Sequence, residues 1–172
     1  MRIFLYSLML IMPLNNSCSE ITFVKISQEI SKQQLEQGIR SGDKDYFHEI
    51  RIKLSELGKL NFYNSSCDTL FLLESYDIEN ANFYGKIWNN EGFVAYTYNN
   101  GNFNFDKVGA YTQYTCKLIQ DWDIKKIRHE ESTNSTMFNP LLIYGTRVII
   151  QNGTIKVDSI QFKEFFLLER DR

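Results

Sequence analysis

The fold of this chain is decided by residues 83–107, which read FYGKIWNNEGFVAYTYNNGNFNFDK. Three short apolar segments, at 83–88, 93–98 and 103–107, are separated by the joins NNEG (89–92) and NNGN (99–102). An asparagine followed by a glycine tolerates the positive φ angles of a tight hairpin turn. The stretch therefore predicts an antiparallel meander of three strands.

Further strands are predicted on both sides of this meander. Residues 70–74 form a short apolar run typical of a buried strand. Residues 147–151 and 154–162 flank Asn152-Gly153, which predicts a second hairpin. Residues 112–131 fit either a helix or a strand that enters a turn at Asp121, and we favour the helix. We expect a polar loop at 132–135, and Pro140 rules out a helix through its position.

The region before the strands, from 23 to about 60, has helical periodicity. Ser41-Gly42-Asp43 interrupts it, and we expect Gly42 to end one helix and Asp43 to cap the next. In the second helix the pattern predicts one apolar stripe and, just beyond it, an end at Gly58. The stripe consists of Phe47, Ile50, Leu54 and Leu57, with Lys44, Glu49, Arg51, Lys53 and Glu56 at the other positions.

Helices followed by strands that are joined through turns of two to four residues predict an α+β fold. Such turns are too short for the crossover connections of a parallel sheet. We therefore expect N-terminal helices packed on a mostly antiparallel sheet, built from a meander and a C-terminal hairpin. Residues 20–172 are predicted to form a single globular domain.

The first residues, MRIFLYSLMLIMPLNNSCSE, have the layout of a secretory signal peptide. Arg2 and the amino terminus supply positive charge, residues 3–12 are apolar apart from Ser7, and small polar residues follow. The apolar run is shorter than the roughly 20 residues that a membrane-spanning helix needs. Residues 1–19 are therefore predicted to be a signal peptide, and the remainder to be exported.

The end of this segment, Ser17-Cys18, resembles the processing site of bacterial lipoproteins. It departs from the usual pattern at Asn15, since that position usually holds a leucine and Leu14 stands one place earlier. The resemblance implies that Cys18 becomes a lipidated first residue, in the periplasm or at the outer-membrane surface. The protein would then contact the membrane only through its lipid anchor. The alternative is ordinary cleavage after Ser19, with Ser17 and Ser19 as the small residues at the site, and secretion.

Two further cysteines, Cys67 and Cys116, lie in the expected domain. Exported chains mature in an oxidising compartment, so the two are a disulfide candidate. On the chain-entropy model a bridge closing a loop of about 50 residues would contribute roughly 4 kcal/mol. The alternative is two separate buried thiols that pack as small apolar residues.

Composition and motifs narrow the function classes. With 19 basic and 21 acidic residues and a net charge of −2, the chain lacks the positive surplus of nucleic-acid binders. It has no HExxH, paired CxxC or EF-hand pattern, no GxSxG and no phosphate-binding glycine loop. We therefore expect neither a metal nor a cofactor.

His48 beside Glu49, or His129 before Glu130-Glu131, would be the general base of a hydrolase with an unfamiliar site.

Aromatic residues are the one surplus, at 15% of the chain. The candidates for a binding surface are Tyr84, Trp88, Tyr96 and Tyr98, on the outer face of the meander. Rings with polar tips suit protein interfaces, and aromatic faces beside amides also suit sugars. The alternative is that these residues are ordinary strand formers. The sequence thus favours a non-enzymatic envelope protein that binds a protein partner, with a glycan-binding module as the alternative.

Overall fold

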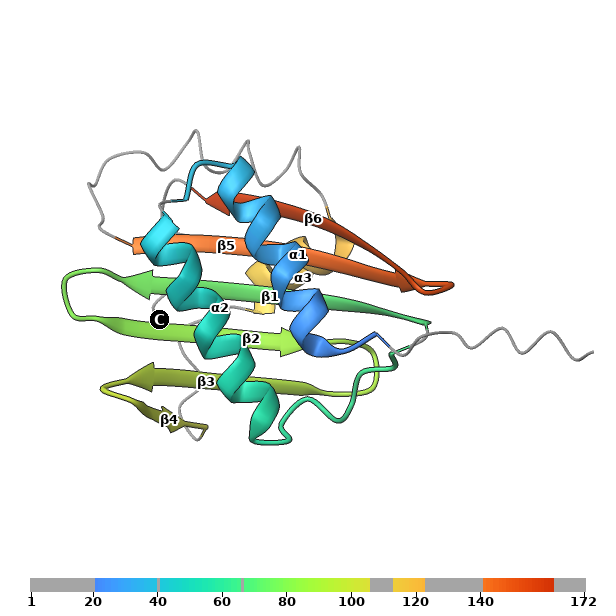
Figure 1. Cartoon of the computed structure of the whole chain (residues 1–172), viewed down its shortest axis with the longest axis horizontal. Helices are drawn as coiled ribbons and strands as arrows, with labels where there is room; N and C mark the ends of the chain where they lie inside the picture. The colour runs from blue at the N-terminus through green and yellow to red at the C-terminus, as the bar shows by residue number, and fades with distance from the viewer. Residues whose placement is uncertain (1–20, 40, 66, 106–112, 123–140, 163–172) are drawn as a thin grey trace, which may run out of the picture.

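A six-stranded antiparallel sheet carries two helices on one face and a third helix on the other (Figure 1). The computed structural model describes residues 21–39, 41–65, 67–105, 113–122 and 141–162. The strands lie in the order β4-β3-β2-β1-β5-β6. The elements are α1 (Phe23–Glu36), α2 (Ser41–Glu56), β1 (Cys67–Asp77), β2 (Asn82–Trp88), β3 (Phe93–Asn99), β4 (Asn102–Asn104), α3 (Gln113–Asp121), β5 (Leu141–Gln151) and β6 (Thr154–Phe162). The predicted α+β architecture is therefore confirmed.

Both Asn-Gly turns have the backbone that the sequence predicts. Asn100 and Gly101 have φ angles of 49° and 82°, and Asn152 and Gly153 have 50° and 73°. Positive φ at both central residues matches the right-handed twist of the flanking strands, which explains the preference for Asn-Gly at these positions. The meander and the C-terminal hairpin thus form as predicted, and the hairpin joins the sheet by pairing β5 with β1.

Several strand and helix bounds differ from the predicted ones. β5 begins at Leu141, six residues before the predicted start at 147. β1 extends well beyond 70–74 because it is a central strand, paired with β2 on one side and β5 on the other. β4 is shorter than the predicted 103–107 and covers only Asn102–Asn104. α3 confirms a helix over the first part of 112–131, and Trp122 ends it with a φ of 50°. Residues 123–140, with the predicted loop and Pro140, lie outside the described residues.

The first helix ends earlier than predicted, at Glu36 rather than near Gly42. Gly38 adopts a φ of 94°, the left-handed conformation that commonly follows a helix end, and its amide donates to the Leu35 carbonyl at 3.0 Å. Gly42 instead lies in the first turn of α2. The prediction that Gly42 separates the helices was wrong, because Gly38 provides the break and Gly42 has an ordinary helical neighbourhood.

The predicted inward face of α2 needs two corrections. Phe47, Ile50 and Leu54 are fully buried as expected, but Leu57 follows the last helical residue and is 52% exposed. Arg51 was expected among the outward charged residues and is instead fully buried. Arg51 lies four residues after Phe47 and three before Leu54, so the geometry of an α-helix places it on the same face.

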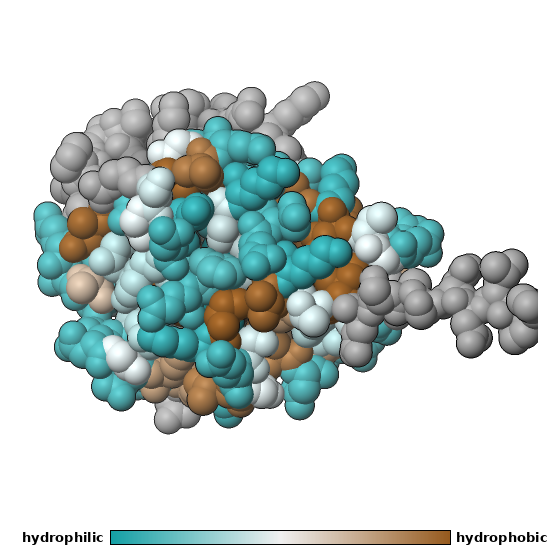
Figure 2. Space-filling model, in the orientation of Figure 1, coloured by the Kyte–Doolittle hydropathy of each residue, from teal (hydrophilic) through white to brown (hydrophobic). Residues whose placement is uncertain are grey.

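Strand alternation divides the apolar core into two layers. Between the sheet and the α1–α2 pair lie inward-facing side chains from all six strands. On the opposite face, α3 packs through Cys116 and Ile119 on a smaller cluster that includes Phe71 and Leu73. The outer surface over α1 and α2 is mainly hydrophilic, with apolar side chains in separate patches (Figure 2). Among the residues that the structure describes, no helix has the length and apolar character needed to cross a membrane.

Candidate functional site

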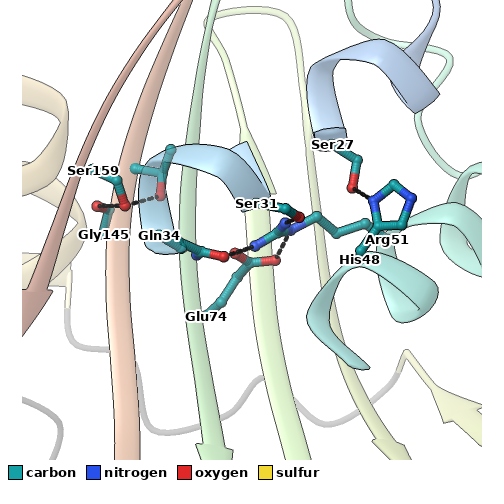
Figure 3. A network of polar contacts seen from close by, with 9 residues as sticks. Ser27, Ser31, Gln34, His48, Arg51, Glu74, Gly145 and Ser159 are labelled. Carbon is teal, nitrogen blue, oxygen red and sulfur yellow. Dashed lines mark hydrogen bonds and ion pairs between the residues drawn. The ribbon is translucent and has the colours of Figure 1, made fainter. Parts of the chain in front are cut away.

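A fully buried ion pair lies beneath the two N-terminal helices (Figure 3). Arg51 on α2 forms two hydrogen bonds to Glu74 on β1, from Nε to Oε1 at 2.7 Å and from Nη2 to Oε2 at 2.6 Å. Both side chains have 0% exposure. This is the bidentate geometry in which a guanidinium and a carboxylate interact most strongly.

Two residues of α1 complete the surroundings of the guanidinium. Nη1 donates to Ser31 Oγ at 3.2 Å, and Nη2 also donates to Gln34 Oε1 at 2.9 Å. The Phe47 ring lies 5.8 Å from the guanidinium carbon. Arg51 therefore connects α1, α2 and β1. A fully buried ion pair cannot contact a ligand in solution, so its role is to fix the helices on the sheet.

Sequence reasoning missed this pair because it assigned every charge on α2 to solvent. Two signals pointed to it. Arg51 is in phase with Phe47 and Leu54, and Glu74 ends the apolar run of residues 70–74. Charged side chains are almost never fully buried unless they are paired. A charge in phase with a core stripe therefore calls for an opposite charge on a neighbouring buried element.

His48 was a candidate general base, and it also lies between the helices (Figure 3). Its Nδ1 lies 2.8 Å from Ser27 Oγ on α1, and Ser27 is fully buried. The pKa of His48 is lowered below its usual value of 6.5, mainly by burial and next by the Arg51 charge. The ring is therefore neutral at pH 7. Glu49, the expected carboxylate partner, binds Lys53 instead, with 2.5 Å between Oε1 and Nζ. These contacts give His48 a structural role that ties α2 to α1.

A groove of about 410 Å³ runs between α1 and α2 beside His48. Its charged groups are Lys32, Lys44 and Asp45, of which Lys44 and Asp45 pair with each other at 3.1 Å. Ser31, at the bottom of this groove, is only 6% exposed and accepts from Arg51. The two serine hydroxyls nearest the groove and His48 are those of Ser27 and Ser31, and both residues are buried, at 0% and 6% exposure. His129, the other candidate base, lies outside the described residues.

The four aromatic candidates do not share one surface. The β2–β3 register pairs Tyr98 with Phe83, and Tyr96 with Gly85, on the face covered by α1 and α2. Tyr96 and Tyr98 are 0% and 5% exposed, so the expectation that they form an outer binding surface was wrong. The reason is specific to Gly85: a Cβ there would lie 2.2 Å from Tyr96 Cζ. The missing side chain leaves room for the Tyr96 ring inside the core.

Trp88 and Tyr84 lie on the opposite face, where α3 also packs. Trp88 is 7% exposed and stacks on Phe71, with 5.7 Å between ring centroids. Tyr84 is half-buried. Directly opposite Trp88 in the register is Phe93, which sequence reasoning did not select as a site residue. Phe93 is 65% exposed, more than any other large apolar side chain among the described residues.

A lysine sits between these rings. Lys86 Nζ lies 5.4 Å from the centroids of both Trp88 and Phe93, within the range of cation–π attraction. It also lies 3.6 Å from the Cys116 thiol on α3. We call Tyr84, Lys86, Trp88 and Phe93 the Phe93 surface. The signal that pointed to it is the strand alternation that places residues 84, 86 and 88 together on one face.

The predicted disulfide is absent: Cys67 is an exposed thiol and Cys116 a buried one. Cys116 contacts Lys86, which pairs with Leu73 across β1 and β2, whereas Cys67 begins β1 six residues earlier. Six residues of strand span roughly 20 Å, and a disulfide needs Cα atoms within about 7 Å. The expected bridge was therefore wrong. Burial raises the pKa of Cys116, and the nearby Lys86 charge only partly offsets this.

The remaining site predictions concern metals and the lipid attachment. Over the described ranges, no group of three or more His, Cys, Asp or Glu side chains could hold a metal ion. Cys18, the lipid-attachment candidate, lies outside the described residues. Comparison of the chain with protein-family models, curated proteins and solved structures found no match.

Proposed function

We propose that this chain is an exported cell-envelope protein, anchored through lipid on Cys18, that binds a partner protein through the Phe93 surface. The observation that carries the proposal is the 65% exposure of Phe93 beside the buried rings of Trp88 and Phe71. Phe93 pairs with Trp88, and Trp88 is held by stacking on Phe71. An exposed ring beside such buried rings can bury apolar area on binding with little loss of conformational freedom.

The aromatic residues of this surface support a protein partner. Tryptophan and tyrosine, here Trp88 and Tyr84, are among the residues that dominate binding energy at interfaces, and the Lys86 ammonium lies beside the Trp88 and Phe93 rings. The neighbouring Tyr84 adds a phenol hydroxyl at the rim. Full burial of the Phe93 side chain would contribute about 1.5–3 kcal/mol.

The position of Ile21, the first of the described residues, supports a partner at the membrane. Ile21 is 2% exposed, and its carbonyl accepts from the Tyr63 hydroxyl at 3.2 Å. It follows Cys18 by three residues, a reach of roughly 10 Å at most. α1 starts at the end of the sheet where β2 ends and β3 begins (Figure 1). A lipid on Cys18 would therefore hold this end of the domain, with Phe93, close to the membrane.

Site-specific photocross-linking in the native envelope tests the interface. A benzoylphenylalanine at position 93 should give a discrete adduct with one protein, because the ring would lie in the contact. The control is the same group at position 57, since Leu57 is also exposed, at 52%, but lies just after α2. The same adducts from both positions, or none from position 93, would contradict the proposed surface.

Mass analysis of the native N-terminal peptide tests the anchor. A peptide that begins at Cys18 and carries acyl chains is expected, and Cys18→Ala should release the protein from the membrane fraction. A native chain that begins at Glu20 would support export without the anchor. A chain that retains Met1 would contradict both.

A further inference from the structure

A second surface with binding character lies at the same end of the sheet. The segment after α2, the start of β1 and the β2–β3 turn enclose a cleft of about 560 Å³. This volume is within the range of small-molecule sites. Its lining includes Phe62, Asn64, Ser65, Asp68, Asn90 and Glu91. The cleft involves different side chains from the Phe93 surface, and the inference drawn from it does not depend on that surface.

The walls of the cleft are joined by hydrogen bonds centred on Asp68. Its Oδ2 accepts from the Asn64 amide and from Asn89 Nδ2, both at 2.8 Å, and its Oδ1 accepts from the Thr69 amide at 2.7 Å. Asn89 Nδ2 also donates to the Phe62 carbonyl at 3.1 Å. One carboxylate and one amide therefore hold the segment after α2 against the β2–β3 turn.

The turn itself is held in the same way. Asn89 Oδ1 accepts from the amides of Glu91 at 2.8 Å and Gly92 at 2.9 Å. Phe62 packs directly on Gly92, where an added Cβ would lie 3.0 Å from Phe62 Cβ. These bonds pre-form the cleft, so a ligand would not have to order it. They leave the exposed side chains of Asn90 and Glu91 at its rim.

The charges of the cleft select a class of ligand. The described residues that line it include two carboxylates, Asp68 and Glu91, and neither lysine nor arginine. Phosphate and carboxylate ligands are therefore disfavoured by like charge. A metal ion is disfavoured too, because both Asp68 oxygens already accept backbone or amide hydrogens.

We propose that this cleft binds an uncharged saccharide. Sugar hydroxyls both donate and accept hydrogen bonds, so they match a carboxylate that only accepts and an amide that does both. Glu91 and Asn90 supply these two groups side by side. The half-buried Phe62 ring supplies the apolar surface that the C–H face of a sugar ring needs.

NMR titration of the ¹⁵N-labelled full chain in detergent micelles tests the site. The probes are maltohexaose, cellohexaose, mannohexaose and chitohexaose, with hexagalacturonate as the charged counterpart. At least one uncharged hexamer should shift the amide signals of residues 64–65 and 90–91, and hexagalacturonate should shift none of them. No response to any uncharged hexamer, shifts confined to other residues, or an equal response to hexagalacturonate would overturn the proposal.

The chain offers a matched control for the two rim residues. Asn90→Ala and Glu91→Gln should each weaken binding about tenfold, as expected for the loss of one hydrogen bond to a charged or amide group. Asn80→Ala and Glu79→Gln, exposed in the β1–β2 turn, should leave the affinity unchanged. Equal effects from both pairs would contradict the assignment. Phe93→Ala should retain saccharide binding, so failure of the protein interface and failure of this site are distinguishable.

Discussion

At the scale of single residues, Arg51 connects the two N-terminal helices to the sheet. It is a fully buried cation whose hydrogen bonds reach Glu74, Ser31 and Gln34. Burying two charges costs several kcal/mol per ion, and the mutual attraction offsets this cost only when the geometry is good and the other polar atoms are satisfied. We therefore interpret the pair as a contact that fixes how α1 and α2 pack on the sheet, and not as a source of net stability.

Removing one partner of this pair should destabilise the protein far more than removing both partners. We expect Arg51→Met or Glu74→Gln to lower the free energy of unfolding by about 3–5 kcal/mol, because each leaves an uncompensated buried charge. The double variant Arg51→Met/Glu74→Leu replaces both charges with apolar side chains and should lose less stability in urea unfolding than either Arg51→Met or Glu74→Leu alone.

The exposed i,i+4 pair Lys117–Asp121, at 2.9 Å, is the control for that experiment. Lys117→Met should cost no more than about 0.5 kcal/mol. Additive effects of the two buried substitutions would mean that Arg51 and Glu74 do not form a pair in solution.

His48 should make stability depend on pH. Its pKa is lowered in the folded state, chiefly by burial, from an ordinary value of 6.5. The unfolded chain therefore binds the proton more readily, and the contribution of His48 is fully present above about pH 6.5 and is lost as the pH falls below it. We expect the stability difference between the wild type and His48→Gln to shrink between pH 7.5 and pH 5. A difference that is constant over this range would show that the ring is not held neutral.

At the scale of elements, glycines and asparagines set where helices and strands end. Asn100-Gly101 and Asn152-Gly153 adopt the positive φ angles that two-residue hairpins require. Gly38 also has a positive φ angle, and it ends α1. Gly85 has a different role, because its missing side chain leaves space for the Tyr96 ring. Glycines with different roles look alike in sequence, and only the φ angle or the neighbouring atoms separate them.

Gly38, between the two helices, and Gly42, in the first turn of α2, should respond oppositely to substitution by alanine. Gly42→Ala should stabilise the protein by about 0.5–1 kcal/mol, because the site is helical and an added Cβ meets nothing within 4 Å. Gly38→Ala should destabilise it by about 1 kcal/mol, because its φ of 94° strains any L side chain. Thermal unfolding of the two variants measures both. The reverse order of stability would mean that the helix break lies at Gly42 after all.

At the scale of the whole molecule, the sheet separates two environments. One face is closed by α1 and α2 over a core that includes the ion pair. The other is partly covered by α3 and carries the exposed Phe93. The N-terminal end of α1, the β2–β3 turn and the start of β1 share one end of the sheet (Figure 1). Both proposed binding surfaces therefore lie at the end nearest the expected anchor.

This arrangement predicts different reactivity for the two cysteines of the domain. Cys67 should react with a maleimide in the native protein, because its thiol is exposed. Cys116 should react only after unfolding, because burial shields it and raises its pKa. Peptide mass analysis after labelling under native and denaturing conditions measures each site separately. Protection of both thiols from labelling in the unfolded, non-reduced chain would instead indicate a disulfide.

Local patterns in the sequence were sufficient for the architecture. Two Asn-Gly turns, alternating apolar segments and one helical stripe determined an α+β fold with a meander and a C-terminal hairpin, because turn backbone and side-chain period depend on neighbouring residues. Only the tertiary structure decided which sheet face meets the helices. That choice buried Tyr96 and Tyr98 and left Phe93 in solvent, and the packing of distant segments also paired Arg51 with Glu74 and kept Cys67 away from Cys116. Each depends on contacts between segments distant in the chain, and no short stretch encodes such contacts.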